Sequence, residues 1–269
     1  MGGYKFDYEK KVWGGETLRL SPVHFRAPRL FYGLRALRSV SGRVLDVGCG
    51  VGDIIEALSF YRPDLKLYGI DISKKAISLA KRRVYKAKFC VADVQKIPYD
   101  DSFFDAVICF DLIEHVKRPR SALSEISRVL KSGGILQIFI PTEGNIFTPE
   151  GLLIKLGWKG KQIYGGHPHC FTTRKAKAML KNADFSIIKS YWGDHFVHQI
   201  AEISYFSLLL LMGRNFPYTI EGYINFAKPG LRTSVLAILK DIVASLSFIE
   251  TMSLFWFPGL GLHLTCLKK

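Results

Sequence analysis

The sequence of 269 residues has little cysteine and no paired cysteine motif. Its five cysteines, at positions 49, 90, 109, 170 and 266, include no Cys-x-x-Cys pair, so neither a disulfide framework nor a zinc site is indicated. Three of them lie in apolar, strand-like runs, where cysteine behaves as a small hydrophobic residue. We therefore expect a protein of the reducing cytoplasm.

Long clean apolar runs are also absent. A membrane-spanning helix needs roughly 20 consecutive apolar residues. Residues 203–213 are apolar but too short, and residues 235–267 are interrupted by charged residues and a proline. Between Val235 and Ile249 the apolar residues instead keep helical spacing, which predicts an amphipathic helix. The first ten residues are polar and of mixed charge, so we expect no secretory signal peptide.

Acidic residues are in the minority, with 23 Asp and Glu against 38 Lys and Arg and a net charge of +15. Such an excess favours anionic partners, namely nucleic acid, an acidic membrane surface or acidic metabolites, but a solvated basic surface explains it equally well. The apolar share of 48% and the charged share of 23% describe a globular protein and exclude a disordered one. A chain of this length can bury a substantial core.

What is present, from residue 43 to residue 140, is an alternation of short apolar runs with helical patterns, which predicts βα units and a parallel sheet. The helical patterns cover residues 73–84 with Ser73 as the N-cap, residues 120–134 with two closing glycines, and residues 172–182. The expected strands are residues 43–47, 66–70, 88–91, 104–110, 135–140 and 186–191. A sheet of this kind binds its ligand beyond the carboxyl ends of its strands.

Residues 44–53 read VLDVGCGVGD, an apolar run followed by glycines at alternate positions. Glycine is needed there for a positive φ or for close approach of a ligand to the backbone. A dinucleotide fingerprint would have glycine at Asp53, and Asp46 and Asp53 would repel a pyrophosphate. They would not repel a sulfonium and an ammonium, which favours S-adenosylmethionine. Asp71, which ends the next strand, can bind both ribose hydroxyls, as nicotinamide and adenosyl cofactors alike require.

Two later stretches add to this pattern: ADVQKIPYDDSFFDAVICFDLIEHV (92–116) and LKSGGILQIFIP (130–141). With DVGCGVG and GIDIS before them, they resemble the class I S-adenosylmethionine-dependent methyltransferases. The resemblance is strongest to the methyltransferase type 11 group, which includes the ubiquinone and menaquinone methyltransferases. It covers residues 40–193 and implies a final strand at 261–267. It also implies a Rossmann-like, doubly wound α/β fold with a mostly parallel seven-stranded sheet.

The same resemblance implies S-adenosyl-L-methionine as the cofactor and S-adenosyl-L-homocysteine as the product. The cofactor-binding residues that it implies are Asp46, Gly48, Cys49, Gly50, Gly52, Asp71, Ile72, Asp93, Val94 and Phe110. In this assignment the backbone around Gly48 and Gly50 meets the methionine part, Asp46 orders the loop and Asp71 holds the ribose.

The adenine end of the cofactor would be held by the residues after the second and third strands. The resemblance implies that Ile72 packs on the adenine, that Asp93 accepts from its amino group, and that the Val94 backbone meets the ring. Phe110, at the end of the fourth strand, would line the methionine channel and help to exclude water.

Methyl transfer is an in-line displacement for which positioning supplies much of the rate, so no obvious catalytic motif is required. A general base is needed only when the acceptor must lose a proton. His167 and His169, in GGHPHCFTT, are candidate catalytic residues, with a structural role in tying a loop to the sheet as the alternative. The run from Asp111 to His115 resembles a Glu-x-x-Glu-His metal motif of some relatives, but aspartate replaces the first glutamate, and we expect no metal.

We expect a single methyltransferase domain in four parts. These are an aromatic N-terminal helical lid (1–39), the cofactor-binding core (40–193), an apolar helical insertion (194–259) and the final-strand segment (260–269). The apolar segments and the positive charge favour a small lipophilic acceptor, such as a quinone, an isoprenoid or another lipid, and peripheral contact with an anionic membrane.

Two other functions stay open at this point. RNA methylation would use the positive charge for phosphates, but no dedicated nucleic-acid module is recognisable and the added segments are apolar rather than basic. A non-catalytic S-adenosylmethionine-binding protein would keep the glycine loop, Asp71 and Asp93 without turnover. The intact cofactor residues argue against lost cofactor binding and do not establish catalysis.

Overall fold

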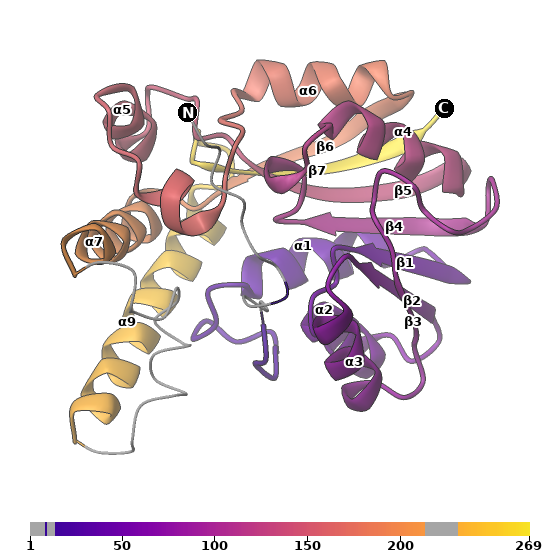
Figure 1. Cartoon of the computed structure of the whole chain (residues 1–269), viewed down its shortest axis with the longest axis horizontal. Helices are drawn as coiled ribbons and strands as arrows, with labels where there is room; N and C mark the ends of the chain where they lie inside the picture. Colours follow the sequence, from indigo (N-terminus) through magenta and orange to yellow (C-terminus); the bar gives the residue numbers. More distant parts are fainter. Residues whose placement is uncertain (1–8, 10–13, 213–230) are drawn as a thin grey trace.

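The computed structural model describes residue 9, residues 14–212 and residues 231–269 (Figure 1). Seven strands form one sheet in the order β3-β2-β1-β4-β5-β7-β6. β7 runs antiparallel to both of its neighbours and the other pairings are parallel, which confirms the predicted fold. The strands are β1 (Arg43–Val47), β2 (Lys66–Asp71), β3 (Lys88–Val91), β4 (Phe104–Phe110), β5 (Leu130–Pro141), β6 (Phe185–Gly193) and β7 (Gly261–Lys268).

Helices cover both faces of this sheet (Figure 1). One face packs against α1 (Ala27–Leu37), α2 (Asp53–Tyr61) and α3 (Lys74–Arg83), and the other against α4 (Pro119–Val129) and α6 (Thr173–Asn182). Because both faces are covered, the central strands are apolar throughout rather than alternating. In β1, Val44 packs into one core and Leu45 into the other.

One predicted helix start is confirmed, and one predicted helix end is wrong. The Ser73 hydroxyl accepts from the Ala76 N–H at the start of α3, which confirms the predicted N-cap. The predicted helix over residues 120–134 is wrong at its end, because α4 stops at Val129 and β5 begins at Leu130. Leu130 is fully buried and pairs with Phe104, so strand pairing overrides local helical preference there.

The remaining helices lie beside the carboxyl ends of the strands. In the sequence, α5 (Pro149–Lys155) and the π-helical turn η2 (Lys161–Gly165) follow β5. α7 (Phe196–Met212) and α9 (Leu231–Ser253) come after β6 and before β7. α7 packs against α5, η2 and α9, and these elements stand to the left of the sheet in Figure 1. Within the described residues, no helix combines the length and apolar character that crossing a bilayer requires.

Candidate active site

A large cavity of about 1270 Å³ opens at the carboxyl ends of β1, β2, β4 and β5. Its walls come from the glycine loop after β1, from the ends of β2 and β4, and from α1, η2 and α7. Following the functions that the sequence predicts, we call the end beside the glycine loop the cofactor end and the end beside α7 and η2 the acceptor end. Its location is the one at which open α/β sheets bind ligands.

The glycine loop has the left-handed backbone that its sequence predicts. Gly48, Gly50 and Gly52 have φ values of 75°, 53° and 86°. A Cβ on Gly48 would also come within 2.9 Å of Leu112 Cδ1, so the loop is pressed against the segment after β4. The Gly48 and Cys49 N–H groups donate to the Ile70 carbonyl, at 2.8 and 3.0 Å. Backbone conformation and close packing together therefore require small residues here.

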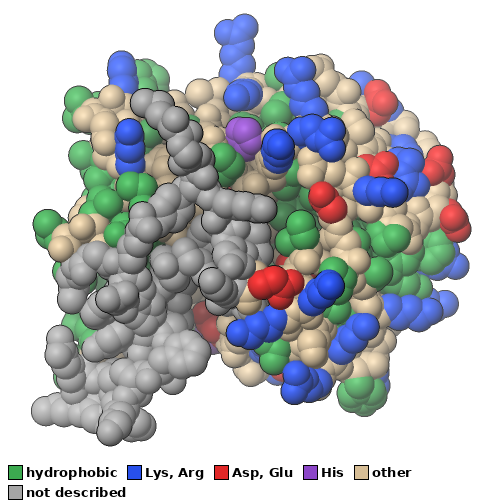
Figure 2. All heavy atoms as spheres, in the orientation of Figure 1, with side chains coloured by type: hydrophobic (Ala, Val, Ile, Leu, Met, Phe, Trp, Pro, Cys, Tyr) green, Lys and Arg blue, Asp and Glu red, His purple; other side chains and the backbone are tan. Residues whose placement is uncertain are grey.

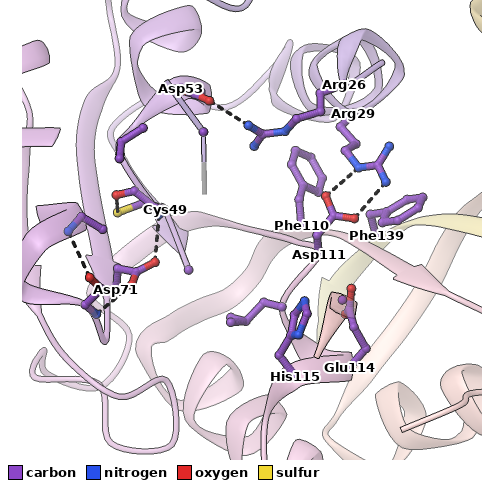
Figure 3. A pocket seen from close by; sticks show the side chains of 18 of the residues that line it. Arg26, Arg29, Cys49, Asp53, Asp71, Phe110, Asp111, Glu114, His115 and Phe139 are labelled. Carbon is purple, nitrogen blue, oxygen red and sulfur yellow. Dashed lines mark hydrogen bonds and ion pairs between the residues drawn. The ribbon is translucent and has the colours of Figure 1, made fainter. Parts of the chain in front are cut away.

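Asp71 ends β2 directly beside this loop (Figure 3). Its carboxylate accepts from the Gly50 N–H and from the Ser73 N–H, both at 2.9 Å. Burial raises the pKa of Asp71, although these backbone hydrogen bonds oppose the shift. Ile72 follows at the rim of the cavity with an exposed side chain. The second strand therefore delivers a carboxylate and an apolar side chain to the same end of the cavity.

Most of the other predicted cofactor residues also line the cavity: Cys49, Asp93, Val94 and Phe110. Asp93 already accepts from the Gln95 N–H, at 2.8 Å, which fixes its carboxylate at the end of β3. Asp46 and Gly52 do not line the cavity. Gly52 begins α2, and Asp46 is buried in β1, where burial raises its pKa to about 8.

Asp53 has a structural role that the sequence did not predict, because there it counted only against a dinucleotide, as a missing glycine and as a carboxylate that repels a pyrophosphate. Its buried carboxylate accepts from the Gly15 N–H at 3.1 Å, from Arg26 Nη1 at 2.9 Å, and from Arg83. It therefore ties the segment before α1 and the end of α3 to the glycine loop (Figure 3). Its arginine partners lie 27 and 30 residues away in the sequence, so no local pattern signals the cluster.

Arg29 is a second residue that sequence reasoning missed. Its Nε and Nη2 donate to both oxygens of Asp111, at 2.7 and 2.9 Å, and Nη2 also reaches Asp194 Oδ2 at 3.3 Å (Figure 3). The guanidinium lies 3.9 Å from the centre of the Phe139 ring. Burial raises the pKa of Asp111, but the Arg29 charge and hydrogen bonds lower it further, so the net shift is downward. One buried cation from α1 therefore joins the ends of β4, β5 and β6.

Both of these aspartates have backbones that L-residues rarely adopt. Asp111 has φ 49° and Asp194 has φ 52°. Asp111 directly follows β4, and Asp194 directly follows β6. Strain of this kind persists only where surrounding contacts determine it, and here the Arg29 contacts do so.

The acceptor end also contains a buried lysine. Lys161 Nζ, on η2, lies 2.7 Å from Glu202 Oε2, 3.1 Å from Glu150 Oε1 and 3.5 Å from Glu143 Oε1. Burial lowers the pKa of Lys161, but the three carboxylates raise it well above its ordinary value. His198, one turn before Glu202 on α7, continues the network, with Nε2 at 3.6 Å from Glu202 Oε2.

Of the two predicted catalytic histidines, His167 lines the cavity. Its Nδ1 lies 2.5 Å from Glu143 Oε1, and both residues are buried. Burial lowers the pKa of His167, but Glu143 raises it to a net value above normal. His169 does not line the cavity, and its Nε2 lies 3.0 Å from the Val116 carbonyl oxygen. His169 therefore ties its loop to the segment after β4.

A group able to hold a metal also lies in this wall. Ligand atoms of Glu114, His115 and His167 lie within 4.8 Å of one another, and Glu114 Oε2 is buried without a hydrogen-bond partner. Carboxylate and imidazole together suit a divalent transition metal. The Asp111 carboxylate is paired with Arg29 and is not part of this group. His167 takes the place that the first acidic residue of the motif would have. The absence of a metal remains a prediction.

Comparison with known proteins identifies this arrangement. Residues 45–138 match the family described as a methyltransferase domain. The chain is 35% identical over 137 residues to the ubiquinone biosynthesis O-methyltransferase of Alkalilimnicola ehrlichii, covering 48% of this chain and 55% of that protein. The matched stretch is therefore a methyltransferase domain, and these similarities support a class I S-adenosylmethionine-dependent methyltransferase. The identity to the 27-O-demethylrifamycin SV methyltransferase of Amycolatopsis mediterranei is 31% over 132 residues, which are 47% of this chain and 48% of that one.

The chain therefore spans only about half the length of the curated relatives that it matches. Solved structures agree in fold. The [4+2]-cyclase SpnF has a TM-score of 0.57 at 22% identity, covering 90% of this chain and 81% of its own. A Thermotoga maritima protein described as a possible histamine N-methyltransferase has a TM-score of 0.55 at 17% identity, covering 91% of each chain. At these identities the likeness concerns the fold alone.

S-adenosyl-L-methionine is the cofactor of this methyltransferase family. The residues at the cofactor end fit it. Gly48 and Gly50 line the cavity with backbone alone, and the Asp71 carboxylate accepts a hydrogen bond from the Gly50 N–H of that loop. When bound, the cofactor supplies an activated methyl group on a sulfonium.

Proposed function

We propose that the protein transfers the methyl group of S-adenosyl-L-methionine to a small lipophilic acceptor. The observation that carries the proposal is the continuity of one large cavity from the glycine loop to an end lined by Phe139, Leu260, Tyr205 and Phe206. Ligand sites that are mainly apolar with a few convergent polar groups are typical of small molecules.

At the cofactor end, each residue has a proposed role. The backbone of Gly48, Cys49 and Gly50 holds the methionine part, and Asp71 accepts from the ribose hydroxyls. Asp46 and Gly52 support the loop without contacting the cofactor, because both lie outside the cavity lining.

The adenine lies between Ile72 and Val94 in this proposal. Asp93 accepts from its amino group, and Phe110 closes the channel to water beside the methyl group. The cavity lining, which contains all four side chains, supports this assignment.

The reaction needs an acceptor atom in line with the breaking carbon–sulfur bond. Holding reactants in this geometry supplies effective molarities on the order of 10⁵ M or more. Where the acceptor is a hydroxyl, His167 takes the departing proton and Glu143 holds its ring in place. We assign this role to His167 rather than His169, because His169 lies outside the cavity and is bonded to Val116.

The relatives described above include a ubiquinone biosynthesis O-methyltransferase and a 27-O-demethylrifamycin SV methyltransferase. They support a small organic acceptor such as a quinone, an isoprenoid or another lipid over a nucleic acid. All five cysteines are free, which supports a cytoplasmic location.

Membrane contact has a candidate surface next to the acceptor end. Phe147, Leu156 and Leu211 are 75% to 89% exposed and lie on or beside α5 and α7. Lys155 and Lys159 are exposed in the same region, and Figure 2 shows basic side chains among apolar ones over α5. Apolar side chains next to lysines favour an anionic bilayer surface. α7 also lines the cavity, so a lipid-borne acceptor would have a short path to it.

The test is incubation of the protein with methyl-labelled cofactor and separate lipid, RNA and protein fractions. We expect label in the lipid fraction, and we expect Leu156→Glu to reduce sedimentation with phosphatidylglycerol vesicles. Label in RNA would identify a nucleic-acid methyltransferase instead. Cofactor binding by calorimetry with no label in any fraction would identify a non-catalytic binding protein.

A further inference from the structure

The outer face of α9 carries large aliphatic side chains that are about half exposed. Those side chains are 47% to 60% exposed: Val235, Ile238, Leu239, Ile242, Leu246 and Ile249. The opposite face is buried through Ala244, Ser247 and Thr251. A surface helix ordinarily turns its apolar stripe inward and its polar residues outward. α9 does the reverse, and the outward stripe is an unpartnered surface of the described chain.

The spacing along this stripe is that of a helix-pairing seam. Val235, Leu239, Ile242, Leu246 and Ile249 are separated by four, three, four and three residues. Alternation of four and three places side chains along the narrow line on which two helices pack knobs into holes. A lipid surface requires only a broad apolar face and does not require this alternation.

A ready-made hole lies beside the seam. A groove of about 320 Å³ is lined by Ile238, Asp241, Ile242, Ser245 and Leu246. The first four of these occupy positions i, i+3, i+4 and i+7 of one helix. In a coiled coil, four residues of the facing helix form the hole that receives a knob. The small Ser245 side chain gives this hole its depth.

The six-residue apolar stripe, which includes Ile238 as well as the seam, reads almost the same in both directions from Ile242. Val235 and Ile249 stand seven residues to either side, and Ile238 and Leu246 stand four to either side. Leu239 and Ser245 stand three residues to either side of Ile242. In a symmetric pair of helices, the large Leu239 side chain of one helix would face the groove at Ser245 of the other. A two-fold symmetric contact must be self-complementary in this way. We propose that α9 pairs antiparallel with α9 of a second copy of this chain, around an axis at Ile242.

The charges of α9 favour a second copy over an anionic membrane. Among the side chains described on α9, Lys240 is the basic one, and its Nζ donates to the Val23 carbonyl, away from the seam. The Glu250 carboxylate accepts from the Phe196 and Val197 N–H groups. Asp241 is the charge next to the groove, and Lys240 pairs with it at 2.8 Å. A membrane-binding helix would instead flank its apolar face with exposed lysines or arginines.

The first experiment is sedimentation equilibrium of the full chain and of Ile242→Asp. We expect the wild-type chain to dimerise reversibly and Ile242→Asp to weaken dimerisation by roughly 100-fold or more, because two carboxylates would meet at the axis. The control is Leu211→Asp on α7, an equally apolar and more exposed position outside the seam. We expect it to dimerise as the wild type does. Circular dichroism of each variant checks that the fold is kept.

The second experiment tests the direction of pairing by disulfide cross-linking in a C90S, C170S background. Antiparallel pairing around Ile242 predicts that Ile242→Cys forms a covalent dimer and that Val235→Cys does not, because residue 235 faces residue 249. Equal cross-linking at both positions would overturn the antiparallel arrangement. A wild-type chain that stays monomeric at all concentrations would overturn the proposal.

A third outcome would assign the seam to lipid. A monomeric wild type that binds phosphatidylglycerol vesicles, and loses this binding in Ile242→Asp but not in Leu156→Glu, would overturn dimerisation through α9. None of these measurements involves methyl transfer, so their failure and the failure of the proposed function are distinguishable.

Discussion

The two ends of the cavity are built in different ways. The cofactor end is assembled from short contiguous stretches, each at the end of one strand, so that Gly48, Asp71 and Asp93 follow β1, β2 and β3 in order. The acceptor end is assembled from distant residues. Arg29 contacts partners 82 and 165 residues away, and Lys161 contacts Glu202, 41 residues away. Local sequence therefore places the proposed cofactor residues, whereas only the folded chain brings together the residues of the acceptor end.

The comparison predicts a large effect from removing Arg29. Arg29→Met leaves the buried Asp194 and the partly exposed Asp111 without their cation. Breaking a buried pair typically costs about 3–5 kcal/mol, and the partial exposure of Asp111 places the expected cost at the lower end of this range. We expect a loss of this size in the free energy of unfolding, measured by urea denaturation. The conservative Arg29→Lys keeps a charge but loses the bidentate contact. We expect its free energy of unfolding to lie between those of the wild type and Arg29→Met. Wild-type stability in Arg29→Met would contradict a structural role for the pair.

A second prediction separates chemistry from cofactor binding. If the acceptor is a hydroxyl, we expect His167→Asn to lower kcat by roughly 10²–10⁴-fold, because a general base contributes about that much. Its cofactor affinity, measured by calorimetry with S-adenosyl-L-homocysteine, should stay within about twofold of wild type. The matched control is His169→Asn, which lies outside the cavity lining. Equal losses in both variants would indicate a loop-ordering role instead.

The third prediction concerns the cofactor end alone. Asp71→Asn keeps the shape of the side chain but removes the charge that accepts from the Gly50 N–H and that we propose to bind the ribose. We expect cofactor affinity to fall by roughly 10- to 100-fold, since hydrogen bonds to charged groups contribute about 1.5–3 kcal/mol. Asp64→Asn, an exposed position paired with Arg62, is the control. Unchanged affinity in Asp71→Asn would contradict the assigned role.

The smallest predicted effect is a pH dependence of stability from His263, which lies behind the acceptor end. The side chain is fully buried, packs against the tilted rings of Tyr32 and Phe139, and has no hydrogen-bond partner for either ring nitrogen. Burial, aided by the Arg29 charge, lowers its pKa to about 3. The folded state therefore stays neutral below pH 6.5, where the unfolded state binds a proton.

Stability due to this histidine is complete above pH 6.5 and falls as the pH drops from there towards 3. The slope from one proton is at most about 1.4 kcal/mol per pH unit. The free energy of unfolding, measured with urea, should differ less between pH 7.5 and pH 5 in His263→Gln than in the wild type. Identical differences would show that His263 does not titrate in this way.

The sequence predicted the sheet, the glycine loop, Asp71 and most of the residues at the cofactor end, because strand periodicity and turn chemistry act over a few residues. It did not predict the end of α4, where pairing of Leu130 with Phe104 overrides helical preference. It also missed Asp53, Arg29 and the partners of Lys161. Each of these depends on side chains brought together by tertiary folding, for which a single sequence has no periodic signal.

Arg26 and Arg29 stand three residues apart at the start of α1, so one helical turn touches both ends of the cavity. A displacement of α1 would act on Asp53 and on Asp111 together. We therefore expect thermodynamic linkage, in which acceptor occupancy changes cofactor affinity by the same factor as the reverse. Calorimetric titration of each ligand in the presence of the other would measure that factor. A factor of one would mean that α1 does not couple the two ends of the cavity.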